Sequence, residues 1–242
     1  MRIDKSIAII TARGGSKRIP GKNIKIFCGK PIIEYSIREA INSEQFDEVM
    51  VSTDSKEIAA IAKKCGANIP FMRSKELASD TATTDETLMG VLNDYKKIGQ
   101  EFKYMCCIYP TAPFVTADKL RGAMQLMRDK NPEQIIPMVK YSFPPQRCNY
   151  IDSNGYAHYT FEQYRMSRTQ DFESWYHDAG QFYVYNIDKF YKCNGDCKEI
   201  IPIVVSETEV QDIDTEEDWE LAEMKYMLMQ RRNNEHYYDT VC

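Results

Sequence analysis

The sequence predicts an α/β fold in which a mostly parallel sheet carries helices on both faces, and three observations support this prediction. Short apolar runs alternate with segments of helical periodicity along most of the 242 residues. The runs are continuous, as in "IAII" at residues 7–10, which is typical of strands buried on both faces. Helices between successive strands act as crossovers, and crossovers place the strands parallel to one another.

Each element follows from its composition and its ends. The expected strands, in chain order, are 6–12, 48–54, 69–72, 104–110, 134–141, 179–187 and 200–206. The expected helices are 31–43, 55–66, 83–99, 116–130 and 215–232. Pro31 suits the first turn of a helix, and Gly66 and Gly99 suit positions just past a helix end. Thr83 and Glu86 have the spacing of a capping box.

Residues 142–178 interrupt this alternation. The stretch "CNYIDSNGYAHYT" at 148–160 has a turn at Asn154–Gly155 between tyrosine-rich segments, which predicts a β-hairpin. We expect one domain over residues 1–242, with an arm that projects from it at about 142–178. Aromatic side chains are costly to leave in water and are enriched at interfaces, so we expect this arm to make a homodimer.

Composition excludes several classes of protein. The net charge of −5 argues against a nucleic-acid partner. No run approaches the roughly 18 to 20 apolar residues of a membrane span, and no signal peptide is expected. The eight cysteines do not form a disulfide pattern, which favours a cytoplasmic location. Cys193 and Cys197 are not accompanied by a second cysteine pair, and the nearest histidine is His177. We therefore expect no zinc site there.

The loop "TARGGSKRIPGKN" at 11–23 directly follows the first buried strand. Ligands of parallel sheets bind beyond the carboxyl ends of the strands, where this loop lies. Gly14 and Gly15 allow close approach of the backbone, and Arg13, Lys17 and Lys22 add positive charge, which together suit phosphate oxygens. The spacing matches neither a P-loop nor G-x-G-x-x-G. The loop therefore predicts a phosphate site of another kind, although a solvated charge run is the alternative.

Two carboxylates precede the last helix. Asp212 and Asp214 are two residues apart, so in an extended segment both face one side and can reach one cation. Oxygen ligands of this kind suit Mg²⁺. The alternative is that acids are favoured here by the helix dipole, which accounts for 216–218 but does not require Asp212.

The first loop resembles the signature of the acylneuraminate cytidylyltransferase family, a group of sugar nucleotidyltransferases. That signature reads approximately ARGGSK-x-(I/L)-P-x-KN, and residues 12–23 match it throughout. The resemblance extends to about residue 230 through "STD" (52–54), "RSKELASDTATT" (73–84), "YPTAPF" (109–114), "AGQFY" (179–183) and "DIDTEEDW" (212–219). It implies a Rossmann-like fold of the nucleotide-diphospho-sugar transferase type, with CTP as co-substrate, a Mg²⁺ ion and an acidic nine-carbon sugar as acceptor.

The resemblance also implies roles for individual residues. The nucleotide-binding set is Ala12, Arg13, Gly14, Gly15, Ser16, Lys22, Asn23, Arg73 and Ser79. Arg13 and Lys22 are expected to carry the phosphates and to be catalytic together with Asp214, while Asp212 and Asp214 are expected to hold the metal. The general base is left open between Asp214 and a metal-bound hydroxide.

The sugar side departs from the sialic acid enzymes at two places. Tyr109 stands where those enzymes have glutamine in "LQPTSP", and Ala179-Gly180-Gln181 stands where they have "NGA". Both changes resemble the branch of the family that activates pseudaminic acid, so Tyr109 and Gln181, with Arg168, are expected to contact the sugar. The expected reaction transfers CMP from CTP to the anomeric hydroxyl of pseudaminic acid and releases pyrophosphate.

Two alternatives stay open. The first is the same reaction on sialic or legionaminic acid. The second, from a different class, is a nucleotide-binding regulator without catalysis, against which the intact Asp212 and Asp214 argue.

Overall fold

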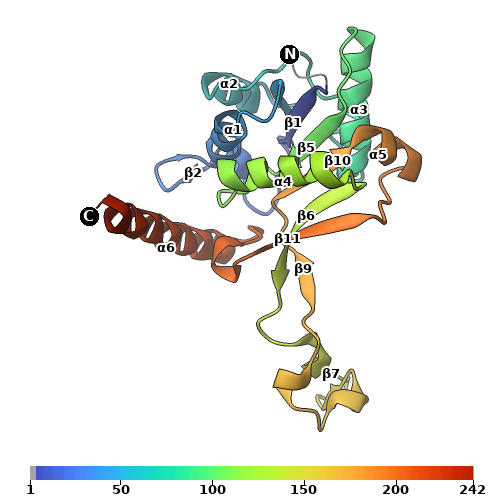
Figure 1. Cartoon of the computed structure of the whole chain (residues 1–242), viewed down its shortest axis with the longest axis vertical. Helices are drawn as coiled ribbons and strands as arrows, with labels where there is room; N and C mark the ends of the chain where they lie inside the picture. Colours follow the sequence, from blue (N-terminus) through green and yellow to red (C-terminus); the bar gives the residue numbers. More distant parts are fainter. Residues whose placement is uncertain (1–3, 242) are drawn as a thin grey trace.

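A mixed seven-stranded sheet runs through the molecule (Figure 1). The computed structural model describes residues 4–241, with the side chains of residues 4–232. The strand order is β11-β6-β10-β5-β1-β4, and β9 pairs with β6 outside this path. The strands of this sheet are β1 (Ser6–Thr11), β4 (Glu48–Ser52), β5 (Tyr104–Ile108), β6 (Gln134–Lys140), β9 (Tyr176–Asp178), β10 (Phe182–Asn186) and β11 (Ile200–Val205).

Five of the strands run in one direction, as expected. β1 is parallel to β4 and β5, and β11 is parallel to β6. β10 lies antiparallel between β5 and β6, and β9 is antiparallel to β6. These two strands run the other way because the chain returns from the arm directly to the sheet, with no crossover helix to reverse it.

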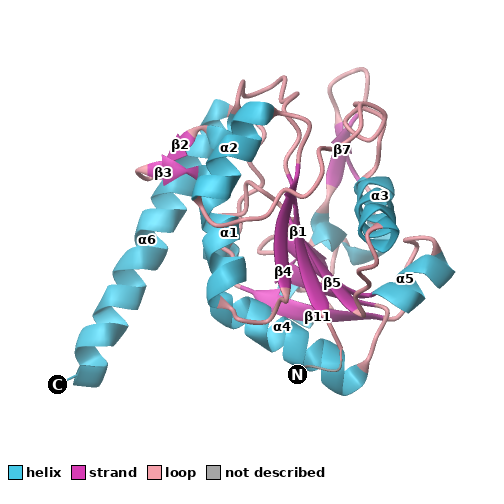
Figure 2. Cartoon of the chain, turned by 90° about the horizontal axis from the view of Figure 1, so that it is seen from above, coloured by secondary structure: helices cyan, strands magenta, loops and turns pink. Residues whose placement is uncertain are grey.

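Helices cover both faces of the sheet (Figure 2). They are α1 (Ile32–Asn42), α2 (Lys56–Lys64), α3 (Thr84–Lys97), α4 (Ala117–Lys130), α5 (Ile187–Cys193) and α6 (Glu216–Val241). Ala8 and Ile10 of β1 pack with α1, α2 and α4, whereas Ile7 and Ile9 pack with α3 and α5. The continuous apolar run of β1 is therefore explained by burial on two faces.

Helix ends follow the sequence signals. Thr83 and Glu86 form the expected capping box at the start of α3. Gly66 has φ 98° and Gly99 has φ 75°, left-handed conformations that glycine adopts without strain. α6 packs its first turns through Trp219 against a smaller apolar cluster that includes Phe27.

The strand expected at 69–72 does not form. Met50 makes one isolated bridge to Asn68, and the ladder stops there. Pro70 has no N–H with which to continue it. The chain instead turns so that the N–H of Arg73 donates to the carbonyl of Thr53 at 2.8 Å. α5, β9 and the short pair β2 (Ile26–Phe27) and β3 (Lys30–Pro31) were not expected from the sequence.

An arm between β6 and β9 projects from the sheet (Figure 1). Its hairpin pairs β7 (Asn149–Ile151) with β8 (Ala157–Tyr159), and Gly155 in the turn has φ 86°. The arm presents apolar side chains to solvent, namely Phe143, Tyr150, Ile151, Tyr156, Met166, Trp175 and Tyr176. Within residues 4–241, no helix has the length and apolar character that crossing a membrane requires.

Candidate active site

A cavity of about 510 Å³ opens at the carboxyl ends of β1 and β5. Its size is ordinary for a small-molecule site. It is lined by the loop after β1, by Lys22 and Asn23, by residues between Arg73 and Thr87, and by residues 109–111. The loop expected to bind phosphate thus shares one cavity with residues of two other segments that resemble the cytidylyltransferases, 73–84 and 109–114.

The loop at 11–23 is fastened on two sides. The N–H of Gly14 donates to Oδ1 of Asp54 at 2.8 Å, and the buried side chain of Asn23 donates to the carbonyl of Arg13 at 2.8 Å. A Cβ on Gly14 would lie 3.1 Å from the Cβ of Ser55, so packing restricts this position. A Cβ on Gly15 would meet nothing within 4 Å, and its φ is not positive. Neither packing nor backbone conformation therefore requires glycine at 15. Close approach of a ligand to the backbone would require it.

Four basic side chains around the cavity are held by acidic partners. Arg13 Nη1 and Lys17 Nζ lie 2.7 and 2.5 Å from the two carboxylate oxygens of Asp80, and these bonds hold the pKa of Asp80 below its usual range. Arg18 Nη1 lies 2.7 Å from Asp214 Oδ2. These ion pairs are exposed and contribute little to stability. An anionic ligand that enters the cavity can therefore displace the carboxylates and bind the basic side chains.

Lys22 differs from the other three because its side chain is only 19% exposed. Its Nζ donates to the carbonyl of Ile213 at 2.6 Å and lies 3.6 Å from Asp214 Oδ1. The lysine is therefore already oriented by the segment before α6. Such orientation before binding reduces the reorganisation that catalysis requires.

Arg73 is held by the end of β4. Its Nε donates to Ser52 Oγ at 3.0 Å and its Nη2 donates to the Ser52 carbonyl at 2.7 Å. Burial lowers the pKa of this guanidinium, and the charge of Asp54 opposes the shift. Ser79 is exposed, and its carbonyl accepts a bond from Arg13 at 3.4 Å.

The structure brings most of the expected nucleotide-binding residues together. Those that line the cavity are Arg13, Ser16, Lys22, Asn23, Arg73 and Ser79. Ala12 is fully buried beneath the loop, and Gly14 and Gly15 belong to the same loop without lining the cavity. Sequence reasoning did not single out Asp80, although it lies in the segment 73–84 that resembles the family.

Asp212 and Asp214 are not used to cap α6. Thr215 and Asp218 do that reciprocally, because Thr215 Oγ1 accepts the N–H of Asp218 at 3.2 Å and Asp218 Oδ2 accepts the N–H of Thr215 at 2.8 Å. The carboxylate of Asp214 instead faces Lys22 and Arg18. Two oxygen-donor side chains beside a basic loop are the ligands that Mg²⁺ takes in phosphate sites.

A second cavity of about 400 Å³ adjoins the first, and Tyr109 lines both. Its other walls are His177, Asp178, Ala179, Gly180, Tyr183, Val210 and Asp212. The rings of Tyr109 and Tyr183 lie 5.4 Å apart, and the Tyr183 hydroxyl donates to Asp178 Oδ2 at 2.8 Å. Burial raises the pKa of Tyr109, which keeps its hydroxyl neutral.

The other two expected sugar residues lie outside this cavity. Gln181 is 2% exposed, and its Nε2 donates to the carbonyl of Glu209 at 2.6 Å. Its Oε1 has no hydrogen-bond partner among the described residues. Arg168 is exposed on the arm and lines neither cavity of its own chain.

Comparison with known proteins places this chain in a family. A family model described as cytidylyltransferase matches residues 7–199. Pseudaminic acid cytidylyltransferase of Campylobacter jejuni is 37% identical over 92% of this chain and 96% of its own length. CMP-N,N'-diacetyllegionaminic acid synthase of Legionella pneumophila is 32% identical over 90% of this chain and 94% of its own.

The fold is found in solved structures as well. A structure of CMP:2-keto-3-deoxy-manno-octonic acid synthetase complexed with CTP superposes with a TM-score of 0.67 at 18% identity, over 94% of this chain and 99% of the other. The resemblance first seen in the loop at 12–23 is thus confirmed along nearly the whole sequence. The chain belongs to the cytidylyltransferase family.

Proposed function

We propose that this chain transfers CMP from CTP to the anomeric hydroxyl of pseudaminic acid. The anomeric oxygen attacks the α-phosphorus, the bond to the bridging oxygen breaks, and pyrophosphate leaves. The observation that carries this proposal is the pair of adjoining cavities. Five basic side chains line the first, and Tyr109 lines both. The identity of 37% to a curated pseudaminic acid cytidylyltransferase supports the choice of sugar.

In this proposal the first cavity holds CTP. Arg13, Lys17 and Arg18 leave their carboxylate partners for phosphate oxygens, and Lys22 meets them already oriented by Ile213. Catalysis then consists of positioning and of neutralising the charge that develops on the leaving pyrophosphate. Asp214 contributes to catalysis through Lys22, whose Nζ lies 3.6 Å from its Oδ1 and which it helps to orient at the reacting phosphates.

Asp212 and Asp214 are the residues that would hold a Mg²⁺ ion. Their fit rests on the donor set, two carboxylates that α6 does not use as caps. When bound, the ion supplies further neutralisation of phosphate charge. Asp212 lines the second cavity, so the pair joins the nucleotide side to the acceptor side.

The second cavity holds the acceptor. Tyr109 presents a ring and one hydroxyl, which suits a sugar with a methyl group where sialic acid has a terminal hydroxyl. Asp178 is fixed by Tyr183 and by the N–H of Gly180 at 2.7 Å, so its carboxylate is oriented in the cavity wall. Gln181 lies outside the cavity with Oε1 buried and without a partner among the described residues, so an acylamino N–H of the sugar reaches it only if the cavity wall moves.

The arm supports a homodimer as the working form. Its exposed apolar side chains include Phe143, Ile151 and Met166, which are 87%, 74% and 90% exposed in the single chain. Because Arg168 lines neither cavity of its own chain, we propose that it binds the sugar carboxylate in the site of a second copy. Seven free thiols in the described part of the chain support a cytoplasmic location.

A pyrophosphate-release assay tests the proposal. The enzyme is supplied with CTP, Mg²⁺ and, in turn, pseudaminic, legionaminic and sialic acid. We expect catalytic efficiency with pseudaminic acid to exceed that with sialic acid by about 10²-fold, the scale on which buried unpaired groups are rejected. Comparable efficiencies would refute the choice of sugar, and absence of pyrophosphate with every sugar would favour a binding protein without catalysis.

A further inference from the structure

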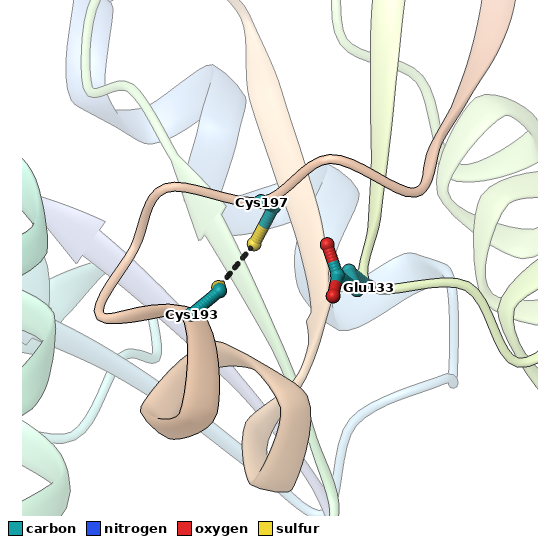
Figure 3. Close-up of side chains that lie close together, drawn as sticks. All are labelled: Glu133, Cys193 and Cys197. Carbon is teal, nitrogen blue, oxygen red and sulfur yellow. Dashed lines mark hydrogen bonds between the residues drawn. The ribbon is translucent and has the colours of Figure 1, made fainter.

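Three potential metal ligands converge at a place that lines neither cavity (Figure 3). Cys193 is the last residue of α5, Cys197 lies in the loop before β11, and Glu133 directly precedes β6. The two Sγ atoms are 3.0 Å apart. One ligand atom from each residue lies within 4.8 Å of the other two.

The local backbone explains why the two thiols meet. Asn194 and Gly195 both adopt left-handed conformations, with φ of 51° and 82°. Two such residues in succession reverse the chain at the end of α5 and bring Cys197 back over Cys193. Asn and Gly are the residues that adopt this conformation most readily, so the turn is specified by the sequence.

The side chain of Glu133 is held by the backbone between Cys197 and β11. Its Oε2 accepts the N–H groups of Lys198 and Glu199 at 2.5 and 3.0 Å. Carboxylates that bind metals are commonly oriented in this way by hydrogen bonds to their second oxygen, which leaves the first oxygen for the ion. Both of these bonds go to Oε2, so Oε1 is the oxygen left to bind an ion.

The charge around the loop also favours a cation. A Cβ on Gly195 would lie 2.4 Å from Oδ2 of Asp85, so a further carboxylate lies against this turn. The neighbouring lysines already have acidic partners, since Lys198 pairs with Asp196 at 2.6 Å and Lys189 with Glu199 at 3.2 Å. Thiolate and carboxylate ligands together are typical of Zn²⁺.

We propose that Cys193, Cys197 and Glu133 bind one thiophilic divalent cation such as Zn²⁺, with water as the fourth ligand. Two thiolates on one tetrahedral zinc lie about 3.8 Å apart, given bonds of about 2.3 Å, so the pair must open by less than about 1 Å. Binding releases the two thiol protons. The ion would tie the end of α5 to the starts of β6 and β11, a structural role apart from transfer of CMP.

Cobalt titration of the reduced, metal-free protein tests this site. Co²⁺ bound to thiolates gives a near-ultraviolet charge-transfer band that carboxylate sites, including Asp212 and Asp214, do not give. We expect the band to saturate at one Co²⁺ per chain in the wild type and in Cys148→Ser, a control that removes an exposed cysteine of the arm. Cys193→Ser and Cys197→Ser should lose it. Glu133→Gln should keep it with affinity weaker by about tenfold or more, at least what loss of a supporting partner costs.

The wild-type spectrum decides the matter even where a variant does not fold. Absence of the thiolate band in the reduced wild-type protein would refute the proposal, and so would an equal band in folded Cys193→Ser. A Cys193–Cys197 disulfide that forms without reductant, in a protein whose reduced form gives no band, would assign the pair to redox chemistry instead. Zinc content measured on the wild type and on Cys148→Ser should be close to one per chain.

Discussion

Replacing Lys22 by Met should abolish most of the activity while leaving the fold intact. Met keeps the length of the stem and removes only the charge. The lost bond from the charged Lys22 Nζ to the Ile213 carbonyl is worth about 1.5–3 kcal/mol of stability, so the variant should stay folded.

The expected loss follows from the position of the charge. At about 4 Å and an effective dielectric constant of about 20, one charge pair is worth about 4 kcal/mol before competing terms. The side chain of Lys22 is 19% exposed, so water screens it less than Arg18, whose side chain is 68% exposed. A loss of about 2.7 kcal/mol of transition-state stabilisation, relative to free enzyme and substrate, corresponds to a 10²-fold fall in kcat/KM. We therefore expect kcat/KM for CTP to fall by about 10²-fold or more.

The assay is pyrophosphate release at saturating Mg²⁺ and sugar, with thermal unfolding followed in parallel. Lys25→Met is the matched control, because it removes a lysine of the same stretch that instead contacts Glu216 and the ring of Trp219. Its kcat/KM should stay within about twofold of the wild type. Turnover of Lys22→Met near the wild-type value, with an unchanged KM for CTP, would show that the loop does not hold the reacting phosphates.

Three further predictions address the metal, the assembly and the sugar. Asp212→Asn and Asp214→Asn should each raise the Mg²⁺ concentration needed for half-maximal rate, and full activity of both at low Mg²⁺ would remove their metal role. Ile151→Lys with Tyr156→Lys on the arm should convert the dimer to a monomer in light scattering, and a wild type that is monomeric at micromolar concentration would already contradict the proposal. Tyr109→Gln should lower the preference for pseudaminic over sialic acid by about tenfold in paired kcat/KM measurements, whereas an unchanged ratio would show that this side chain does not choose the sugar.

The sequence anticipated the framework because its signals are local. Thr83 and Glu86 mark the start of α3 by their spacing alone, and the apolar run of β1 marks a strand buried on both faces. Pro70 is a local signal against a strand at 69–72. The apolar residues on either side of it nevertheless fit the pattern of a buried strand, and the prediction followed that pattern. The direction of β10 depends on where the chain returns from the arm, which no window of residues reveals.

The same limit applies to the sites. The loop at 11–23 could be singled out as a candidate phosphate site because its glycines and cations are contiguous, and the structure places it at a cavity. Asp80 could not, because its pairing with Arg13 spans 67 residues and depends on the fold. Cys193 and Cys197 alone are too few ligands for a zinc site. The third ligand, Glu133, lies far away in sequence, directly before β6, and only the fold brings it to the cysteines.

The shared position of Tyr109 limits how this enzyme can be re-engineered. Any change at 109 made to admit another acceptor also alters a wall of the cavity that we propose for CTP, so we expect selectivity and use of CTP to change together. Asp178 and Gly180 line the second cavity alone, and substitutions there carry no such cost to the nucleotide. New acceptor specificities should therefore be sought first in the turn between β9 and β10, with Tyr109 left as it is.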